Sequence, residues 1–316
     1  MKILITGADG FVGGWLAHGL LAAGHSVTGT HRQNGGLGVV LAQSDAARIE
    51  WRELELASAE LVQEVCRPKW DAVVHLAALS SGSEARRDPG LAWEVNAAGT
   101  ARLAEGLGLR VAAGQANPVF LMVSSGEVYG AGRGVAHRET DPPLPCSPYA
   151  ASKLAAEVAA LEVGRRTGLR VIIARPFPHT GPGQDIRFVV PALASRLLAA
   201  KQIGVTSVKA GSLEPVRDFL DVRDVAEAYR LLLERGLPGE VYNLASGEGH
   251  ALSEVLARLE RLAQWKVTPE LEAKLTRRSD LLHLVGDSTK LREQTGWRPL
   301  IPLDQTLRDL LDAQAH

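Results

Sequence analysis

Tyr149 and Lys153 lie four residues apart in the segment PYAASK, a spacing that places both side chains on one face of a helix. A phenol with an ordinary pKa of about 10 exchanges protons poorly at neutral pH, and an ammonium beside it lowers that pKa. Ser147 can cap the helix at its N-terminus, and Pro148 suits its first turn. The pair therefore predicts proton exchange with a substrate oxygen, with Tyr149 as the acid–base group and Lys153 as its cationic partner.

Polar residues also gather upstream, in the stretch SSGEVYG at 124–130, which follows an apolar run typical of a strand. A serine hydroxyl at the end of such a strand can hydrogen-bond a carbonyl or an alkoxide while Tyr149 exchanges the proton. Ser124 and Ser125 are both candidates for this position, and Glu127 adds a carboxylate nearby. We expect this stretch to meet the Tyr149 helix in one site.

The N-terminus carries the motif GADGFVG, in which Gly7, Gly10 and Gly13 separate a strand-like run from a helix-like stretch. Gly7 permits a tight turn, Gly10 lets the backbone approach a pyrophosphate, and Gly13 allows close packing of helix on strand. The helix N-terminus also offers free amide groups and a partial positive charge to phosphates. The motif predicts a nicotinamide dinucleotide site, in which Lys153 would also hydrogen-bond the nicotinamide ribose.

The end of the second strand-like run indicates which dinucleotide binds. An NAD enzyme places Asp or Glu there to bind both ribose hydroxyls, whereas this chain has Thr30, His31 and Arg32 and no carboxylate. A guanidinium can pair with a 2′-phosphate. We therefore expect NADP(H) to be preferred and NAD(H) to be possible. The alternative is that Arg32 is a solvated surface residue.

Short β-branched runs alternate with Ala- and Leu-rich stretches through the first half of the chain. The strand-like runs are at 2–6, 26–30, 49–54, 71–76, 119–124 and 169–174, and the clearest helix-like stretches are at 11–23, 91–113 and 149–167. Such alternation implies parallel strands joined by right-handed crossovers. It predicts an α/β fold built on a Rossmann-type doubly wound parallel sheet.

The composition of the chain changes after Arg175, where three prolines and two glycines lie between 176 and 183. Such a cluster is typical of a loop and of a domain transition. We expect a dinucleotide-binding domain over 1–175, joined by about 216–246, and a smaller C-terminal lobe in 176–316 that binds substrate. The cleft between the two is the expected binding site.

The 316 residues are 46% apolar and 22% charged, with a formal net charge of −1, which does not favour nucleic acid or an anionic membrane as a partner. Cys66 and Cys146 have no metal-ligand spacing, so we expect two reduced thiols and no metal site. No apolar run approaches the roughly 20 residues of a membrane helix. Glycines also interrupt the N-terminal run too early for a secretory signal. These features predict a cytoplasmic protein.

In their order along the chain, the motifs resemble those of the extended short-chain dehydrogenase/reductases, the NAD(P)-dependent epimerases, dehydratases and reductases of sugar nucleotides. The matching motifs are TGxxGxxG from Thr6, HLAA from His75, NxxGT from Asn96, Ser125, YxxxK from Tyr149 and RP from Arg175. The resemblance implies hydride transfer between a nicotinamide cofactor and a sugar carbon. It also implies a homodimer joined through the helices at 91–113 and 149–167, although their apolar faces could instead belong to the monomer's own core.

Within that family the chain resembles the GDP-6-deoxy-D-mannose reductases and the GDP-mannose 4,6-dehydratases. The stretches that carry this resemblance are SGEVYG at 125–130, HTGPGQ at 179–184, VRDF at 216–219 and RRSD at 277–280. It implies that Ser125 rather than Ser124 is the catalytic serine. The implied cofactor contacts come from Gly7, Gly10, Phe11, Val12, Gly13, His31, Arg32, Glu55, Leu56, Leu76, Ala77, Ala78, Tyr149, Lys153 and Pro176. The implied substrate contacts come from Ser81, Ser125, Glu127, His179, Arg217 and Arg277, with the two arginines clamping the pyrophosphate.

The chain departs from the family's pattern at two of these places. Pro178 stands where the family usually has Asn, so a side-chain amide that would contact the sugar is missing. Glu55 stands where the adenine-binding position usually has Asp, which keeps the acceptor on a longer arm. The role of Glu127 stays open as well, since this carboxylate could transfer a proton, as in the dehydratases, bind a substrate hydroxyl, or be structural.

The activity implied is the NADPH-dependent reduction of GDP-4-keto-6-deoxy-D-mannose to GDP-D-rhamnose. The alternatives among enzymes are a GDP-mannose 4,6-dehydratase, which Glu127 keeps open, and a nucleotide-sugar 4-epimerase, which His31 and Arg32 disfavour because such epimerases generally use NAD. A non-enzymatic alternative is an NADP-sensing regulatory protein, which would not need the Tyr149–Lys153 pair.

Overall fold

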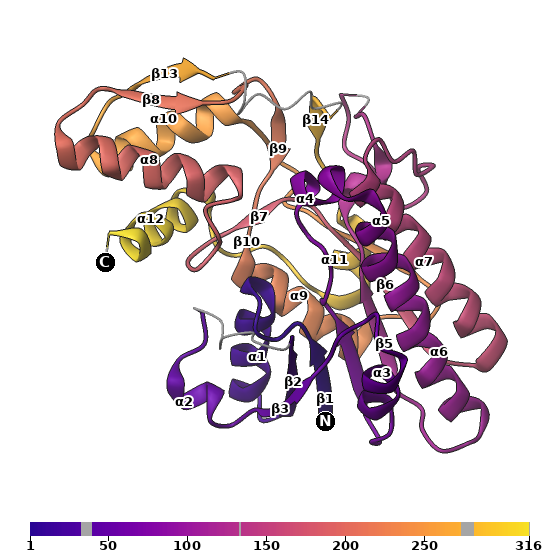
Figure 1. The fold of residues 1–316 in the computed structure, drawn as a ribbon. Helices are drawn as coiled ribbons and strands as arrows, with labels where there is room; N and C mark the ends of the chain where they lie inside the picture. The colour runs from indigo at the N-terminus through magenta and orange to yellow at the C-terminus, as the bar shows by residue number, and fades with distance from the viewer. Residues whose placement is uncertain (33–39, 133, 273–280, 316) are drawn as a thin grey trace.

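The computed structural model describes residues 1–32, 40–132, 134–272 and 281–315. At its centre lies a seven-stranded sheet whose strands are all paired in parallel (Figure 1). The order is β11-β6-β5-β4-β1-β2-β3, formed by β1 (Lys2–Thr6), β2 (Ser26–His31), β3 (Glu50–Glu53), β4 (Ala72–His75), β5 (Val119–Val123), β6 (Arg170–Pro176) and β11 (Val241–Leu244). This confirms the predicted Rossmann-type doubly wound sheet. The strand order reverses between β1 and β4, which is where open α/β sheets bind ligands.

Helices cover both faces of the sheet (Figure 1). One face is covered by α1 (Phe11–Ala22), α9 (Val222–Arg235) and α11 (Thr289–Thr295), and the other by α3 (Ala59–Cys66), α6 (Gly99–Ala112) and α7 (Pro148–Thr167). Each face has its own apolar cluster, with Leu20 and Tyr229 in the first and Leu107 and Phe120 in the second. Burial on both faces explains why a central strand such as β5 is apolar throughout.

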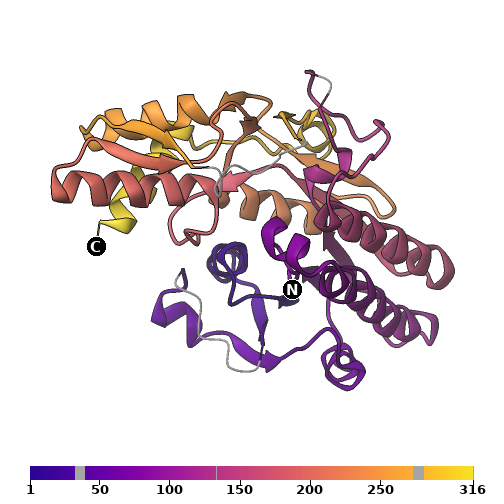
Figure 2. The same cartoon turned by 45° about the horizontal axis from the view of Figure 1, so that its top comes forward.

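A smaller lobe lies over one edge of this sheet (Figure 2). Its apolar core is shared by α8 (Val189–Ile203), α10 (Leu252–Ala263) and α12 (Leu303–Gln314), and β8 (Ser207–Ala210) pairs in parallel with β13 (Thr268–Leu271). Short elements complete the described residues: α2 (Gln43–Ala46), α4 (Gly82–Arg87), α5 (Pro89–Ala92), the 3-10 helix η2 (Gly126–Tyr129), β7 (His179–Thr180), β9 (Val216–Asp218), β10 (Leu220–Asp221), β12 (Gly249–Ala251) and β14 (His283–Leu284). None of the helices in the described part of the chain is long and apolar enough to span a membrane.

The predicted helix at 91–113 is not one regular α-helix, and to this extent the prediction was wrong. A π-helix, η1 (Trp93–Ala98), separates α5 from α6. The wider turn holds Asn96, whose Oδ1 accepts a hydrogen bond from the Leu79 amide (2.8 Å) and whose Nδ2 donates to Ser152 Oγ (3.0 Å). Apolar periodicity does not reveal such a turn, since buried polar contacts hold it in place.

Helix α7 begins as its sequence predicts. Ser147 is the N-cap, and its hydroxyl accepts a hydrogen bond from the Ala150 amide at 3.1 Å. Pro148 occupies the first turn, where its missing amide hydrogen costs nothing. The helix ends before Gly168, whose φ of +81° lies in the left-handed region that glycine adopts readily. Both caps come from local sequence, so the position of Tyr149 and Lys153 along this helix is fixed locally.

The glycine loop between β1 and α1 leaves no room for side chains at two positions. Gly7 has a φ of +71°, and its amide donates to Thr30 Oγ1 (3.1 Å) at the end of the neighbouring strand. A Cβ added at Gly13 would lie 2.2 Å from the Gly7 carbonyl oxygen and 2.7 Å from Ala8 Cα. The first turn of α1 can pack this closely on the loop only because residue 13 is glycine.

We expect Gly13→Ala to lower the free energy of unfolding, because its Cβ must displace backbone atoms; the cost of such overpacking is about 1–3 kcal/mol. Gly19→Ala is the matched control, because it lies in the same helix and its Cβ would meet nothing within 4 Å. That change should stabilise the chain by about 0.5–1 kcal/mol, the helix preference of Ala over Gly. Urea unfolding measures both. Equal effects of the two substitutions would contradict the close packing at Gly13.

Candidate active site

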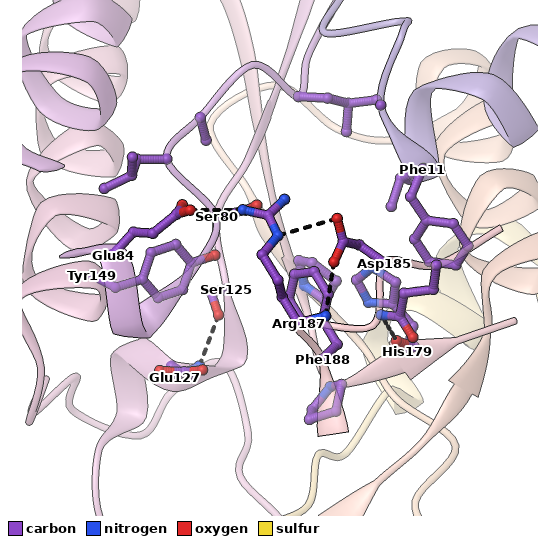
Figure 3. A pocket seen from close by; sticks show the side chains of 18 of the residues that line it. Phe11, Ser80, Glu84, Ser125, Glu127, Tyr149, His179, Asp185, Arg187 and Phe188 are labelled. Atoms are coloured by element: carbon purple, nitrogen blue, oxygen red, sulfur yellow. Dashed lines mark hydrogen bonds and ion pairs between the residues drawn. The ribbon is translucent and has the colours of Figure 1, made fainter. Parts of the chain in front are cut away.

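A cavity of about 1230 Å³ opens between the carboxyl edge of the sheet and the smaller lobe (Figure 3). Most residues expected from the sequence to bind cofactor or substrate line it: Gly7, Gly10, Phe11, Val12, Gly13, His31, Arg32, Glu55, Leu56, Leu76, Ala77, Ala78, Ser125, Glu127, Tyr149, Lys153, Pro176, His179 and Arg217. Their roles remain predictions, but the fold places these distant segments around one space.

One expected substrate contact, Ser81, is not found on the wall of this cavity, and a second lies outside the described residues. Ser81 caps α4, since its hydroxyl accepts from the Glu84 amide (3.3 Å) and is 2.8 Å from Ser83 Oγ. The neighbouring Ser80 lines the cavity instead (Figure 3), because successive residues in an extended segment point in opposite directions. Arg277, in the stretch 277–280, lies outside the described residues.

The dinucleotide end of the cavity is formed by the glycine loop. Gly10 is the N-cap of α1 without a side-chain cap, and Phe11, Val12 and Gly13 of the first turn line the cavity. Free amide groups and the positive end of the helix dipole suit a pyrophosphate at this position. A loop built from glycines can also approach the phosphates closely, so the residues present fit a dinucleotide.

Two basic side chains lie at the end of β2, with one acidic neighbour. His31 and Arg32 both line the cavity, and no carboxylate follows the strand directly. The acidic neighbour is Asp9 of the glycine loop, whose carboxylate interacts electrostatically with His31 and Arg32. Burial raises the pKa of Asp9, while a backbone hydrogen bond and the electrostatic effects of His31 and Arg32 oppose the rise. A second anion at this place, such as a ribose phosphate, would compete with Asp9 for Arg32.

Tyr149, Ser125 and Glu127 meet on one wall of the cavity (Figure 3). Ser125 Oγ hydrogen-bonds Tyr149 and also accepts from the Glu127 amide (3.2 Å). Burial and the negative charge of Glu127 raise the pKa of Tyr149, and the bond from Ser125 only partly opposes this. The sequence predicted the opposite direction for the phenol of Tyr149, so that prediction was wrong for the protein without its cofactor. The reasons are the burial of the phenol, which acts most strongly, and the negative charge of Glu127, which acts in the same direction.

Lys153 is 4% exposed and lies in the cavity wall on α7. Burial lowers its pKa to about 8, and the carboxylate of Glu157 acts in the opposite direction. Lys153 makes no hydrogen bond to another residue in the described part of the chain, so its ammonium is available to a ligand in the cavity. The sequence missed Glu157; an acid one helical turn after Lys153 in an Ala-rich helix was the available signal.

Arg217 also lines the cavity, close enough to Glu127 for the two charges to interact. Its guanidinium donates to the carbonyls of Val216 (2.8 Å) and Leu281 (2.7 Å). Burial lowers the pKa of Arg217, and the negative charge of Glu127 opposes this. Glu127 thus affects the pKa of both the Tyr149 phenol and the Arg217 guanidinium, and a guanidinium is a cation suited to a diphosphate.

The lobe side of the cavity is held by aromatic and ionic contacts. His179 stacks on Phe11 with ring centroids 6.3 Å apart, and its Nδ1 donates to the Phe177 carbonyl (3.0 Å). Burial lowers the pKa of His179, so it is neutral at pH 7. Arg187, which the sequence missed, forms an ion pair with Glu84 (2.7 Å) that joins the lobe to the main domain (Figure 3).

Known proteins share this sequence pattern along nearly the whole chain. A family model described as GDP-mannose 4,6 dehydratase matches residues 4–310. GDP-6-deoxy-D-mannose reductase from Pseudomonas aeruginosa is 36% identical over 98% of this chain and 96% of its own length.

Two solved structures have the same fold. The structure of RMD from Pseudomonas aeruginosa complexed with NADPH has a TM-score of 0.82 and 33% identity, and covers 99% of this chain and 98% of that one. UDP-glucose 4-epimerase from Thermus thermophilus in complex with NAD has a TM-score of 0.86 and 31% identity, and covers 100% of this chain and 99% of that one. The chain therefore belongs to the GDP-mannose 4,6-dehydratase family of the extended short-chain dehydrogenase/reductases.

Proposed function

We propose that this protein reduces the 4-keto group of GDP-4-keto-6-deoxy-D-mannose with NADPH and releases GDP-D-rhamnose. The observation that carries the proposal is the meeting of Ser125, Tyr149 and Lys153 in one cavity beside the glycine loop. The substrate follows from the similarity to the reductase of Pseudomonas aeruginosa over nearly the whole chain.

NADPH, when bound, supplies the hydride that reduces C4 of the sugar. Tyr149 donates the proton to O4, and Ser125 hydrogen-bonds the same oxygen and orients the carbonyl. The raised pKa of Tyr149 suits this direction of reaction, because the phenol stays protonated until an alkoxide develops beside it. An enzyme that first oxidises its sugar needs the tyrosinate instead. Lys153 binds the ribose of the cofactor and stabilises the tyrosinate left by proton donation.

The preference for NADPH rests on Arg32 and His31 at the end of β2. A guanidinium there can bind a 2′-phosphate through charge-assisted hydrogen bonds, and the similar structure from Pseudomonas aeruginosa is complexed with NADPH. NAD(H) remains possible, since the epimerase from Thermus thermophilus is complexed with NAD on the same fold.

The sugar nucleotide occupies the lobe side of the cavity in this proposal. Arg217 binds the diphosphate together with Arg277, and Glu127 and His179 contact the sugar. Pro178 contributes only its carbonyl, which accepts from the Leu220 amide (2.9 Å), so the sugar loses a contact that the family usually makes. Assembly as a homodimer and a cytoplasmic location stay predictions.

Glu127 favours one second candidate, the GDP-mannose 4,6-dehydratase. A carboxylate beside Tyr149 could move the C5 proton that elimination of water requires, and the family model carries that enzyme's description. The rise that Glu127 produces in the pKa of Tyr149 weighs against the initial oxidation.

A pair of assays distinguishes these two reactions. We expect the protein to oxidise NADPH in the presence of GDP-4-keto-6-deoxy-D-mannose and to leave GDP-mannose unchanged without added cofactor. NADPH absorbance follows the first reaction, and mass spectrometry of the sugar nucleotide follows both. Formation of a ketosugar from GDP-mannose alone would favour the dehydratase, and failure of both assays would contradict the proposed substrate.

Tyr149→Phe should lower kcat for the ketosugar by a factor on the order of 10²–10⁴, because the general acid is lost. The Kd for NADPH should change little, since the hydroxyl is directed to the substrate oxygen. Tyr242→Phe is the matched control, because Tyr242 is buried away from the cavity and its hydroxyl accepts only the Leu237 amide in the described part of the chain. Steady-state kinetics check both variants, and an unchanged kcat in Tyr149→Phe would refute the mechanism.

Substitutions at the end of β2 and at the neighbouring Asp9 should change the affinity for NADPH and not that for NADH. We expect Arg32→Ala to weaken NADPH binding by about 10- to 100-fold, the range for one lost charge-assisted hydrogen bond. Asp9→Asn should strengthen NADPH binding, because a repulsive carboxylate beside Arg32 is removed. Arg52→Ala is the control, since Arg52 pairs with Glu50 (2.6 Å) outside the cavity. Fluorescence titrations at one salt concentration measure the Kd values, and tighter binding of NADH to the wild type would contradict the assignment.

A further inference from the structure

Glu157 is a buried carboxylate close to Lys153 that the proposed reaction does not use. Glu157 is 2% exposed and follows Lys153 by one turn of α7. Its Oε1 accepts from Ser124 Oγ and from Arg175 Nε (2.9 Å), and its Oε2 accepts from Arg175 Nη2 (2.7 Å). Two parallel hydrogen bonds from one guanidinium fix the direction of the carboxylate. The contact therefore joins α7 to the ends of β5 and β6.

The ion pair continues into two further elements. Arg175 Nη1 donates to Tyr129 Oη (2.9 Å), and Tyr129 Oη donates to Asn243 Oδ1 (2.7 Å) on β11. The guanidinium also lies 4.9 Å from the centroid of the Tyr129 ring, a cation–π contact. Each of these residues is at most 5% exposed, so the network is shielded from solvent and its geometry is restricted.

Every residue proposed to act in the reaction is close in sequence to a member of this network. Ser125 directly follows Ser124, and Glu127 shares the turn η2 with Tyr129. Tyr149 and Lys153 lie two turns and one turn before Glu157 on α7. A shift of Glu157 relative to Arg175 would therefore move the reacting groups relative to one another.

We propose that Glu157 is a positioning residue of this active site: its carboxylate fixes α7 against β5 and β6 and places a negative charge one helical turn from buried Lys153. The proposal rests on the proposed function only in assigning Lys153 to the reaction. Glu157 does not itself line the cavity, so it acts through Lys153 and Ser124 and not on the substrate.

Titratable groups on several elements lie near Lys153, and among them the carboxylate of Glu157 raises the pKa of Lys153. His75 on β4 faces Lys153, but burial lowers the pKa of His75 to about 3, so this imidazole is neutral and bonded to Thr6 and Thr100. Tyr149 lies one turn before Lys153 on the same helix and is a neutral phenol, and the positive charge of Arg175 on β6 is paired with Glu157.

The sign of the expected pH effect depends on these groups. Lys153 loses its proton as the pH rises through its pKa of about 8. Without the Glu157 carboxylate, burial acts unopposed and the ammonium is lost at lower pH. An opposite charge within about 4–6 Å changes a pKa by about one unit or more, and side chains four residues apart on a helix are neighbours at about 5–6 Å between their Cβ atoms. The alkaline limb of activity should therefore move to lower pH.

The experiment compares Glu157→Gln with the wild type. The first readout is the pKa of Lys153 in the cofactor-free protein, from a pH titration of ¹³C-labelled lysine Cε resonances by NMR, assigned by the peak lost in Lys153→Arg. The second is the pH profile of kcat for reduction of the ketosugar by NADPH. Glu162→Gln is the matched control, because Glu162 lies on α7 but is exposed and paired with Arg166 (2.8 Å).

A second variant covers the case in which Glu157→Gln does not fold, since it leaves Arg175 buried without its partner. Glu157→Gln combined with Arg175→Met removes both charges and keeps similar volumes, and such replacements of a buried pair are often neutral or stabilising. Lys153 loses the Glu157 carboxylate in this variant too, so its pKa should fall as well.

We expect the Lys153 titration and the alkaline limb to move down together by about one pH unit in the variants of Glu157 and to stay in place in Glu162→Gln. An unchanged Lys153 pKa in the folded variants would overturn the proposal, as would a loss of kcat that is uniform over pH. The titration uses no sugar nucleotide. A shifted pKa in a protein that reduces no ketosugar would therefore refute the proposed function and leave the role of Glu157 standing.

Discussion

The carboxyl ends of parallel strands lie at one edge of a sheet, and the candidate site of this protein depends on that constraint. Gly7 follows β1, His31 ends β2, Ser125 follows β5 and Pro176 ends β6. Residues far apart in the sequence thus line one cavity because the strands that precede them are neighbours in the sheet. The strand order reverses beside β1, which leaves room for a dinucleotide above the edge. Chemistry on this fold is therefore a property of the few residues directly after each strand.

Local sequence was sufficient where local physics decides the structure. Alternating β-branched and Ala-rich stretches predicted the Rossmann-type sheet, and Ser147 with Pro148 predicted the start of α7. It was insufficient where contacts between distant residues decide. Periodicity gave one helix at 91–113, because nothing local shows that Asn96 bonds Leu79 and Ser152. The ion pair of Glu157 with Arg175 and the cavity-facing position of Ser80 also depend on the assembled fold.

The electrostatics of the site also required the structure. The spacing of Tyr149 and Lys153 indicates proximity, but the pKa of each group depends on everything that surrounds it. Burial acts in opposite directions on the two, raising the pKa of the phenol and lowering that of the ammonium. Each group also has its own carboxylate. Glu127, which lines the cavity, raises the pKa of Tyr149, and Glu157, which does not line it, raises the pKa of Lys153. The order of proton affinities that a reductase needs comes from the placement of these acids.

The π-helix η1 has a consequence for how this chain tolerates changes of length. Each residue of an α-helix turns the chain by about 100°, so one added residue would normally rotate everything before it relative to everything after it. In η1 the wide turn absorbs such an addition, so α6 keeps its apolar side on the sheet while Asn96 bonds toward α7. A single-residue deletion in Trp93–Ala98 would barely alter composition or helix propensity, yet it would separate Asn96 from its partners. At this segment the number of residues is therefore as strict a constraint as their identity.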